Sequence, residues 1–373
     1  MSETSPKIII IGPSTPPPGG VAAIVEQFSG QHFKEVFHVK LINTVPKVNL
    51  LRFKICKPFN WTRYTIQVII HALFFRHHSV ILQMSNDKIC IREFFFAWVY
   101  KTFTHSKIFI HFHGNITNRK KAYPFIPEVI EKKSIQKKLN FGFSQADAVL
   151  FLTENIQKSF TPYLSKSIIE KSVVINNFTT VEFFQNKKKH SGFNILYVGR
   201  FSQEKGLHDL LTSFKFLSEK YPDIRCHLCG ELSTDKELKQ ALQNEENAKD
   251  SKVINHGIVY GIKKAEVFSI ADVLVLPSYR EIFPVVILEA YAQGVPVIAA
   301  NTGVVNEILQ DNVNGFLIES GDIKTLTEKI EYLYNNSELC KQIGTINKQV
   351  ATEKYDVKIA IEKIRKILNR GNS

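Results

Sequence analysis

Cysteine, tryptophan and methionine are scarce in this 373-residue sequence, which has five, two and two of them. The cysteines are odd in number and unevenly spread, which favours a reducing compartment over a disulfide framework. Cys226 and Cys229 form a CxxC, but the stretch IRCHLCG reads as an apolar strand and no second ligand pair accompanies it. We therefore expect two packed thiols there and no zinc site.

Long hydrophobic runs are also missing. No uncharged apolar stretch approaches the roughly 20 residues that a membrane-spanning helix needs, and the opening MSETSPKIIIIG does not resemble a signal peptide. These absences predict a cytoplasmic protein, either free or at the inner face of the cytoplasmic membrane. GxSxG and P-loop motifs are absent as well, and the sequence shows no nucleic-acid-binding motif, so no nucleic-acid partner is expected.

The positive charge of the chain, +13 in total, is confined to its first half. Residues 1–190 contain 26 Lys and Arg against 11 Asp and Glu, a net charge of +15, whereas residues 191–373 contain 22 against 24, a net charge of −2. This asymmetry predicts that one half of the protein faces an anionic partner and the other does not.

Strand-length apolar runs alternate with helix-like stretches along the chain, which predicts an α/β fold with helices on both faces of parallel sheets. The length favours two domains. We expect strands at 7–11, 79–84, 107–112, 148–152, 194–198, 224–229, 252–256, 272–276, 295–299 and 315–318. We expect helices at 21–29, 206–220, 235–247, 262–270, 284–293, 303–310, 322–335 and in the terminal stretch VKIAIEKIRKILNR.

The polar, basic stretch QNKKKHSG (185–192) predicts the linker between the two domains. The resulting division is an N-terminal domain over 1–188, a C-terminal domain over 189–350, and a terminal segment 351–373 whose helix packs back towards the first domain.

Two glutamates mark the segment SYREIFPVVILEAYAQG. Glu281 lies in a loop after a strand, at the sheet edge where α/β proteins bind ligands, and Glu289 lies on the following helix. An unpaired carboxylate in the apolar helix VVILEAYA is expensive, which favours a function over two solvated surface glutamates. The helix that begins near Pro284 offers free N–H groups and a positive dipole end to an anion, so Phe283, Pro284 and Val285 at its start are candidate donor-binding residues.

Two cations follow the strand that ends in YVG. Arg200 and Lys205 stand beside Gly206, at the start of a predicted helix, and such a pair suits a diphosphate. On its own this segment would favour two exposed cations in a polar loop.

Taken together, YVGRFSQEKGLHDLL, ADVLVLPSYREIFPVVILEAYAQGVPVIA and NGFLIESGD resemble the retaining GT-B glycosyltransferases of the group 1 type, found in capsule, exopolysaccharide and lipopolysaccharide assembly. The resemblance covers about 193–335. It implies two Rossmann-like domains with a cleft between them, the first on the acceptor side and the second binding the nucleotide sugar. Ile282 and Gln293 depart from the family pattern, where small residues are common.

The resemblance also implies roles for individual residues. Arg200 and Lys205 would hold the donor diphosphate, Glu281 the transferred sugar and Glu289 the ribose. His113, at the end of IFIHFHG, would lie near the donor sugar as a catalytic residue beside Glu281, while His111 would point into packing. Gly19 and Gly20 would let the backbone approach the donor closely.

The mechanism that the resemblance implies is metal-independent transfer with retention of anomeric configuration. No Asp-x-Asp is present, so no metal and no cofactor are expected, and the nucleotide-diphosphate sugar is a co-substrate. The acceptor would be a lipid-linked or surface-polysaccharide glycan. The basic stretch 118–140 and the aromatic stretch 91–103 predict peripheral contact with an anionic membrane. Two alternatives stay open: a nucleotide-sugar 2-epimerase of the same fold, and a non-enzymatic basic binding protein.

Overall fold

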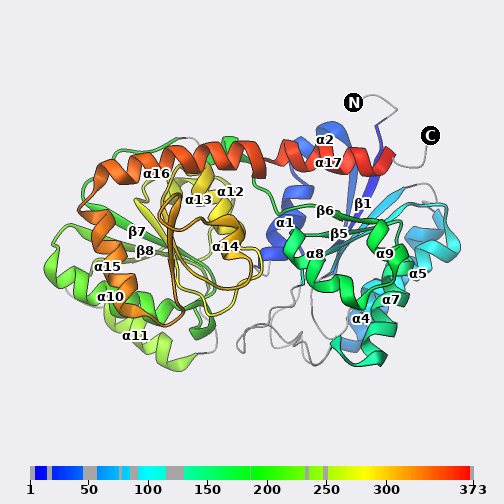
Figure 1. Cartoon of the computed structure of the whole chain (residues 1–373), viewed down its shortest axis with the longest axis horizontal. Helices are drawn as coiled ribbons and strands as arrows, with labels where there is room; N and C mark the ends of the chain where they lie inside the picture. The colour runs from blue at the N-terminus through cyan, green and yellow to red at the C-terminus, as the bar shows by residue number, and fades with distance from the viewer. Residues whose placement is uncertain are drawn as a thin grey trace. The chain divides into compact units, whose positions relative to one another are not determined.

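The chain folds into two compact units, Met1–Asn177 with Val357–Ser373, and Phe178–Asp356 (Figure 1). The computed structural model describes residues 5–14, 19–44, 57–74, 78–84, 91–114, 130–184, 186–231, 235–246 and 251–369. Each unit is built around a six-stranded parallel sheet, as the alternation of strand and helix patterns predicts.

The first unit has the strand order β2-β1-β3-β4-β5-β6. Its strands are β1 (Lys7–Gly12), β2 (His38–Asn43), β3 (Ser79–Met84), β4 (Ile108–Phe112), β5 (Ala148–Phe151) and β6 (Ser172–Val174). Its helices are α1 (Gly20–Phe28), α2 (Gln31–Val36), α4 (Lys57–Phe74), α5 (Ile91–Phe103), α7 (Lys133–Ser144), α8 (Glu154–Phe160), α9 (Lys166–Glu170) and α17 (Val357–Asn369). The central strands are buried on both faces, as is usual in parallel sheets.

The second unit has the strand order β12-β11-β10-β7-β8-β9. Its strands are β7 (Phe193–Val198), β8 (Ile224–Cys229), β9 (Val253–Asn255), β10 (Val273–Leu276), β11 (Val297–Ala300) and β12 (Gly315–Ile318). Its helices are α10 (Leu207–Lys220), α11 (Lys236–Glu246), α12 (Gly261–Ser269), α13 (Val285–Gln293), α14 (Val305–Ile308), α15 (Ile323–Tyr334) and α16 (Ser337–Val350). Figure 1 shows α12, α13 and α16 on one side of this sheet and α10, α11 and α15 on the other.

The first unit ends at Asn177, before the linker that the sequence analysis places at 185–192. The short helical turn Val181–Phe184 packs against α12 and α13, and the Lys188 N–H donates to the Ser269 carbonyl at 3.0 Å. The polar stretch is therefore part of the second unit, because its backbone and charges have partners there. Gln185 lies outside the described residues.

The C-terminal helix α17 belongs to the first unit although its sequence follows the second. It contacts α2, and the Lys107 ammonium donates to the Leu368 carbonyl at 2.6 Å. Its apolar residues recur at helical spacing, and six of them are buried: Val357, Ala360, Ile361, Ile364, Ile367 and Leu368.

Candidate functional site

The loops after β7 and β10 meet at the carboxyl ends of these two strands. Gly206 adopts a positive φ of 67°, and a Cβ there would lie 2.0 Å from the Pro277 carbonyl oxygen. A larger residue at this position would push the two loops apart. This close approach brings Lys205, from the first loop, to Glu281, from the second.

Lys205 and Glu281 form an ion pair, with 2.7 Å between Nζ and Oε1. The Lys205 ammonium also donates to the Arg280 carbonyl at 3.0 Å, and both side chains of the pair are largely buried. The structure thus brings these two predicted residues together. Arg200 follows β7 in the same loop but is exposed, and its backbone carbonyl accepts a hydrogen bond from the Tyr197 hydroxyl at 2.8 Å.

Glu289 is only 5% exposed and is paired with Lys264 of α12, at 2.6 Å between Nζ and Oε1. Burial raises the pKa of the Glu289 carboxyl, and the Lys264 ammonium opposes that shift. The second oxygen, Oε2, has no hydrogen-bond partner among the described residues. The site therefore offers one oriented, unfilled acceptor of the kind that a hydroxyl can satisfy.

Lys264 is a residue that the sequence motifs did not reveal. It lies 25 positions before Glu289 and reaches it because α12 packs against α13. The high cost of a buried, unpaired carboxylate in an apolar helix was the available signal, since it requires a cation from elsewhere in the fold.

The start of α13 lies next to these two pairs. Pro284 precedes the first helical residue, Val285, rather than lying within the first turn, and no side chain of the described chain caps the helix. Phe283, Pro284 and Val285 are all buried. Gly303, which the sequence analysis did not single out, has a positive φ of 59°, and a Cβ there would lie 1.9 Å from the Glu281 carbonyl oxygen.

In the first unit, His113 follows β4 at the carboxyl edge of the sheet. It is 4% exposed, and its Nε2 lies 2.7 Å from Gln83 Oε1 at the end of β3. Burial, assisted by the neighbouring His111, lowers the pKa of His113 well below 6.5, so the imidazole is neutral at pH 7. Gln83 is thus a further residue that only the structure connects to this position.

His111 is fully buried, and its Nε2 lies 3.3 Å from the Ile175 carbonyl oxygen. Burial lowers its pKa to about 4. Its ring lies edge-on to Phe28, at 6.2 Å between centroids. It therefore packs inside the first unit.

The glycine loop after β1 is described only in part, because residues 15–18 lie outside the described residues. Gly19 and Gly20 are exposed at the start of α1, and a Cβ on either would meet nothing within 4 Å. The packing of the chain itself does not require glycine at these two positions.

Other side chains bear on metal and thiol chemistry. Across the described part of the chain, no group of three His, Cys, Asp or Glu side chains is arranged to hold a metal ion. Cys226 and Cys229 are buried free thiols in β8, and burial raises the pKa of Cys229 to about 12. Cys56 and Cys90 lie outside the described residues.

The basic stretch 118–140 is described from residue 130 onward. Lys132, Lys133, Lys137 and Lys138 are exposed at the start and along one side of α7. No helix within the described ranges is long and apolar enough to span a membrane.

Comparison with known proteins places these features in a family context. Residues 178–350 match the family model described as glycosyl transferases group 1. The capsular polysaccharide biosynthesis glycosyltransferase CapM of Staphylococcus aureus is 31% identical over 205 residues, 54% of this chain and 51% of CapM. The sulfoquinovosyl transferase SQD2 of Arabidopsis thaliana is 30% identical over 174 residues, 46% of this chain and 32% of SQD2. The chain therefore spans about half, or less, of these relatives.

Solved structures extend the likeness to nearly the whole chain. Anabaena HepE, solved in complex with UDP and glucose, aligns with a TM-score of 0.71 at 17% identity, over 97% of this chain and 99% of HepE. Sucrose-phosphate synthase from Thermosynechococcus elongatus aligns with a TM-score of 0.72 at 16% identity, over 98% of both chains. These likenesses confirm the GT-B fold predicted from the sequence.

Proposed function

We propose that the chain transfers a sugar from a nucleotide-diphosphate sugar to an acceptor hydroxyl, as a glycosyltransferase of the group 1 family whose model residues 178–350 match. One observation carries the proposal. Glu281 and Glu289, both implied to be donor ligands, are each held by a lysine at the carboxyl edge of the second sheet. Salt-bridged carboxylates at this edge are suited to accept hydrogen bonds from sugar and ribose hydroxyls.

The cations supply the charge that the departing nucleotide needs. Lys205 and Arg200 would neutralise the diphosphate, with the start of α13 adding its dipole. In the retaining course that we infer, the acceptor oxygen bonds to the anomeric carbon as the carbon–oxygen bond to the diphosphate breaks on the same face. The acceptor proton passes to the departing phosphate oxygen, so no metal and no enzymic base is required.

His113 would act as a neutral hydrogen-bonding group towards the transferred sugar. Its ring is oriented by Gln83, and burial keeps it uncharged at neutral pH. We assign it no proton transfer, because a group whose pKa lies so low is a weak base at pH 7.

The decisive test is donor turnover by the purified chain. UDP-glucose is a suitable first donor because HepE, which shares the fold, was solved with UDP and glucose. We expect slow release of UDP without acceptor, faster release with glycan acceptors, unchanged rates in EDTA, and a product with the anomeric configuration of the donor by NMR. Conversion of the donor to its 2-epimer would identify an epimerase, and binding without turnover of any nucleotide sugar would identify a binding protein.

The acceptor side of the proposal includes contact with an anionic membrane. Apolar side chains are exposed on α4 at helical spacing (Ile66, Ile70 and Phe74), and Trp98 and Phe103 are exposed on α5. Helix α4 packs against α5, and α5 packs against α7, which carries the exposed lysines. Exposed apolar side chains beside cations are typical of surfaces that bind anionic lipid, which fits a lipid-linked acceptor.

Sedimentation with vesicles tests this contact. We expect the chain to bind vesicles containing phosphatidylglycerol at low salt and to be released as salt rises. Reversal of Lys132, Lys133, Lys137 and Lys138 to Glu should abolish binding and leave donor hydrolysis intact. The matched control reverses four exposed lysines of the second unit, Lys215, Lys239, Lys324 and Lys354. Equal loss in both variants would contradict a specific surface and indicate a response to net charge alone.

A further inference from the structure

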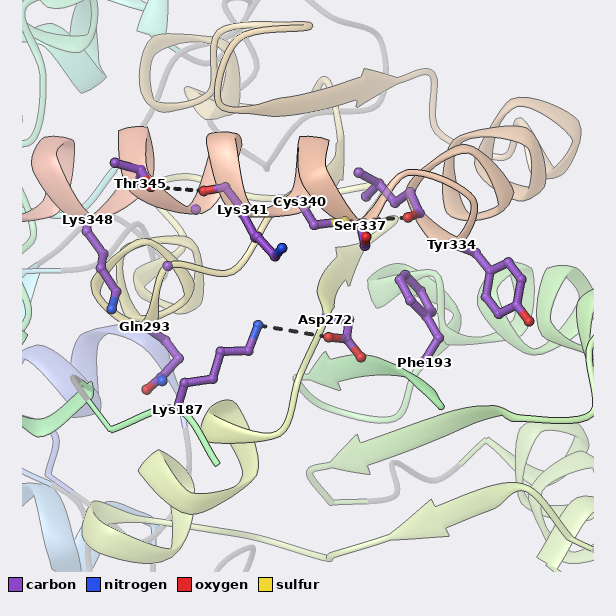
Figure 2. A pocket seen from close by; sticks show the side chains of 13 residues that line it. Lys187, Phe193, Asp272, Gln293, Tyr334, Ser337, Cys340, Lys341, Thr345 and Lys348 are labelled. Atoms are coloured by element: carbon purple, nitrogen blue, oxygen red, sulfur yellow. Dashed lines mark hydrogen bonds and ion pairs between the residues drawn. The ribbon is translucent and has the colours of Figure 1, made fainter. Parts of the chain in front are cut away.

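A cavity of about 320 Å³ lies at the amino end of the second sheet, opposite to the edge that holds Glu281 (Figure 2). It is lined by Phe193, which begins β7, by Asp272, which directly precedes β10, and by residues of α13, α15 and α16. The six residues of β7 separate it from Gly199 by roughly 17–20 Å, at about 3.3 Å per residue. The cavity is therefore distinct from the donor site, and its volume falls in the range of about 300–1,000 Å³ that small-molecule sites occupy.

Gln293 is the feature of this cavity that its packing does not explain. The side chain is 1% exposed, yet neither Oε1 nor Nε2 has a hydrogen-bond partner among the described residues. Helices α13 and α16 approach closely here, since a Cβ on Gly344 would lie 2.3 Å from the Gly294 carbonyl oxygen. A close approach of two helices favours small apolar side chains between them. A buried amide with no protein partner at this position therefore indicates that a bound molecule supplies its hydrogen bonds.

The charged side chains around the cavity are mostly cations. Lys187, Lys341 and Lys348 line it together with a single carboxylate, Asp272. Figure 2 shows Lys187 extending toward Asp272, with Lys341 reaching down from α16 into the same space. The Lys187 ammonium lies 3.9 Å from Asp272 Oδ1, and the Asn194 N–H donates to Asp272 Oδ2 at 2.9 Å. The Asp272 carboxylate is thus already paired, and Lys341 also pairs with Glu338, at 3.2 Å between Nζ and Oε2. The residues that line the cavity still carry more positive than negative charge.

The remaining walls combine apolar surface with hydroxyl groups. Phe193 and Leu333 contribute the apolar side, and Ser337 and Thr345 of α16 contribute hydroxyls. Cations suit a phosphate, an apolar face suits a sugar ring, and an amide with hydroxyls suits sugar hydroxyl groups.

We propose that this cavity is a second ligand site, for a small sugar phosphate, separate from the donor site of the proposed function. The phosphate lies among Lys187, Lys341 and Lys348, and the Gln293 amide pairs with sugar hydroxyls. Because α13 carries both Gln293 and Glu289, a ligand here contacts the helix that forms part of the donor site.

Calorimetric titration of the full chain with glucose 1-phosphate tests the proposal. The titration uses the Lys205→Met background, so that binding at the donor diphosphate position does not contribute. We expect saturable binding that falls at least about tenfold in Gln293→Leu and in the double variant Lys187→Met/Lys341→Met. Lys215→Met/Lys324→Met, which removes two exposed lysines of α10 and α15, is the matched control and should bind normally.

Two further ligands separate the parts of the proposal. Inorganic phosphate should bind more weakly than glucose 1-phosphate, and glucose should not bind. Equal affinity for phosphate would overturn the sugar assignment, and equal affinity for glucose would overturn the role of the cations.

The thermal midpoint without ligand guards against a folding artefact. Gln293→Leu should melt at or above the wild-type midpoint, because it removes a buried amide with no partner. Absence of binding up to about 10 mM, or binding that survives both site variants, overturns the proposal. Neither result depends on donor turnover, so failure of this proposal would leave the proposed function untouched, and failure of the proposed function would leave this proposal untouched.

Discussion

At the carboxyl ends of its strands, the second unit holds Glu281 and Glu289 against Lys205 and Lys264, whereas the first unit holds His113 against Gln83. Both units place these groups on the same type of six-stranded parallel sheet. The carboxyl edge of the second unit's sheet therefore holds pairs of opposite charge, and that of the first unit's sheet holds a neutral imidazole and an amide. The same architecture supports both because the residues after the strands, and not the sheet, determine the chemistry.

The distribution of charge follows the same division. The first unit, residues 1–177 and 357–373, contains 28 Lys and Arg against 11 Asp and Glu, whereas the second unit, residues 178–356, contains 20 against 24. In the first unit the surplus cations described on α7 are exposed, while the histidines that are buried lose their charge. The contrast separates a region suited to electrostatic attraction from one in which cations stabilise particular carboxylates.

Removing Lys205 should cause the largest loss. Lys205→Met removes the cation from a largely buried Glu281 and from the proposed diphosphate, so turnover should fall by about 100-fold. Lys220→Met is the matched control, because Lys220 forms a pair of similar length with Glu331, at 2.6 Å, on the surface. Initial rates of UDP release would measure both. If the two variants lose activity equally, the buried position of Lys205 has no special role.

Substitution of His113 tests the role of the neutral imidazole at the edge of the first unit's sheet. His113→Asn should lower turnover by about 30-fold, which corresponds to about 2 kcal/mol of transition-state stabilisation. His71→Asn is the control, because His71 is also buried in the first unit and hydrogen-bonds Tyr100 at 3.4 Å. Specific activity and thermal midpoint should be measured together. A variant of His113 that melts early but keeps full specific activity would assign the residue to packing.

Titration with UDP alone should distinguish the roles of Glu281 and Glu289. Glu289→Gln should raise the dissociation constant of UDP by about tenfold, or about 1.4 kcal/mol, because it removes the proposed ribose acceptor. Glu281→Gln should leave UDP binding nearly unchanged and reduce sugar transfer.

Lys264→Met should weaken UDP binding in the same direction as Glu289→Gln. Without its ammonium partner, the carboxyl has nothing to oppose the rise in its pKa that burial causes. Calorimetry with UDP would measure each dissociation constant. Equal weakening by Glu281→Gln and Glu289→Gln would show that the two roles are assigned wrongly.

The smallest expected effect concerns the pH dependence of stability. Burial lowers the pKa of His111 from 6.5 to about 4, so the native state excludes a proton that the unfolded chain binds below 6.5. The stability from neutral His111 is complete above pH 6.5 and is lost as pH falls from there towards 4. At pH 6 the loss is about 1 kcal/mol.

Replacement of His111 by Phe removes this titration. The free energy of unfolding of His111→Phe, measured in urea between pH 7.5 and 5.5, should fall less with pH than that of the wild type. Parallel curves would show that His111 can take up a proton in the native state.

Local sequence determined much of the fold. The predicted strands 79–84, 224–229 and 315–318 are observed with those bounds, because each is a short apolar run between polar residues or turn signals. The end of α13 was predicted equally well, since Gly294 terminates that helix in a left-handed conformation with a φ of 75°. By contrast, β2 and β6 were not predicted. Strand β2 mostly alternates exposed and partly buried residues, and β6 has only three residues, so neither has a strong local pattern.

The sequence by itself determined which residues could form the proposed donor site, because Lys205, Glu281 and Glu289 each lie in a motif of consecutive residues. The tertiary structure alone decided how these residues are paired. Lys264 reaches Glu289 through the packing of α12 on α13, and Gln83 reaches His113 through the pairing of β3 with β4. Gln293 lines a cavity because α16 returns across α13. Such contacts join residues that are distant in the chain, and local propensity and periodicity carry no information about them.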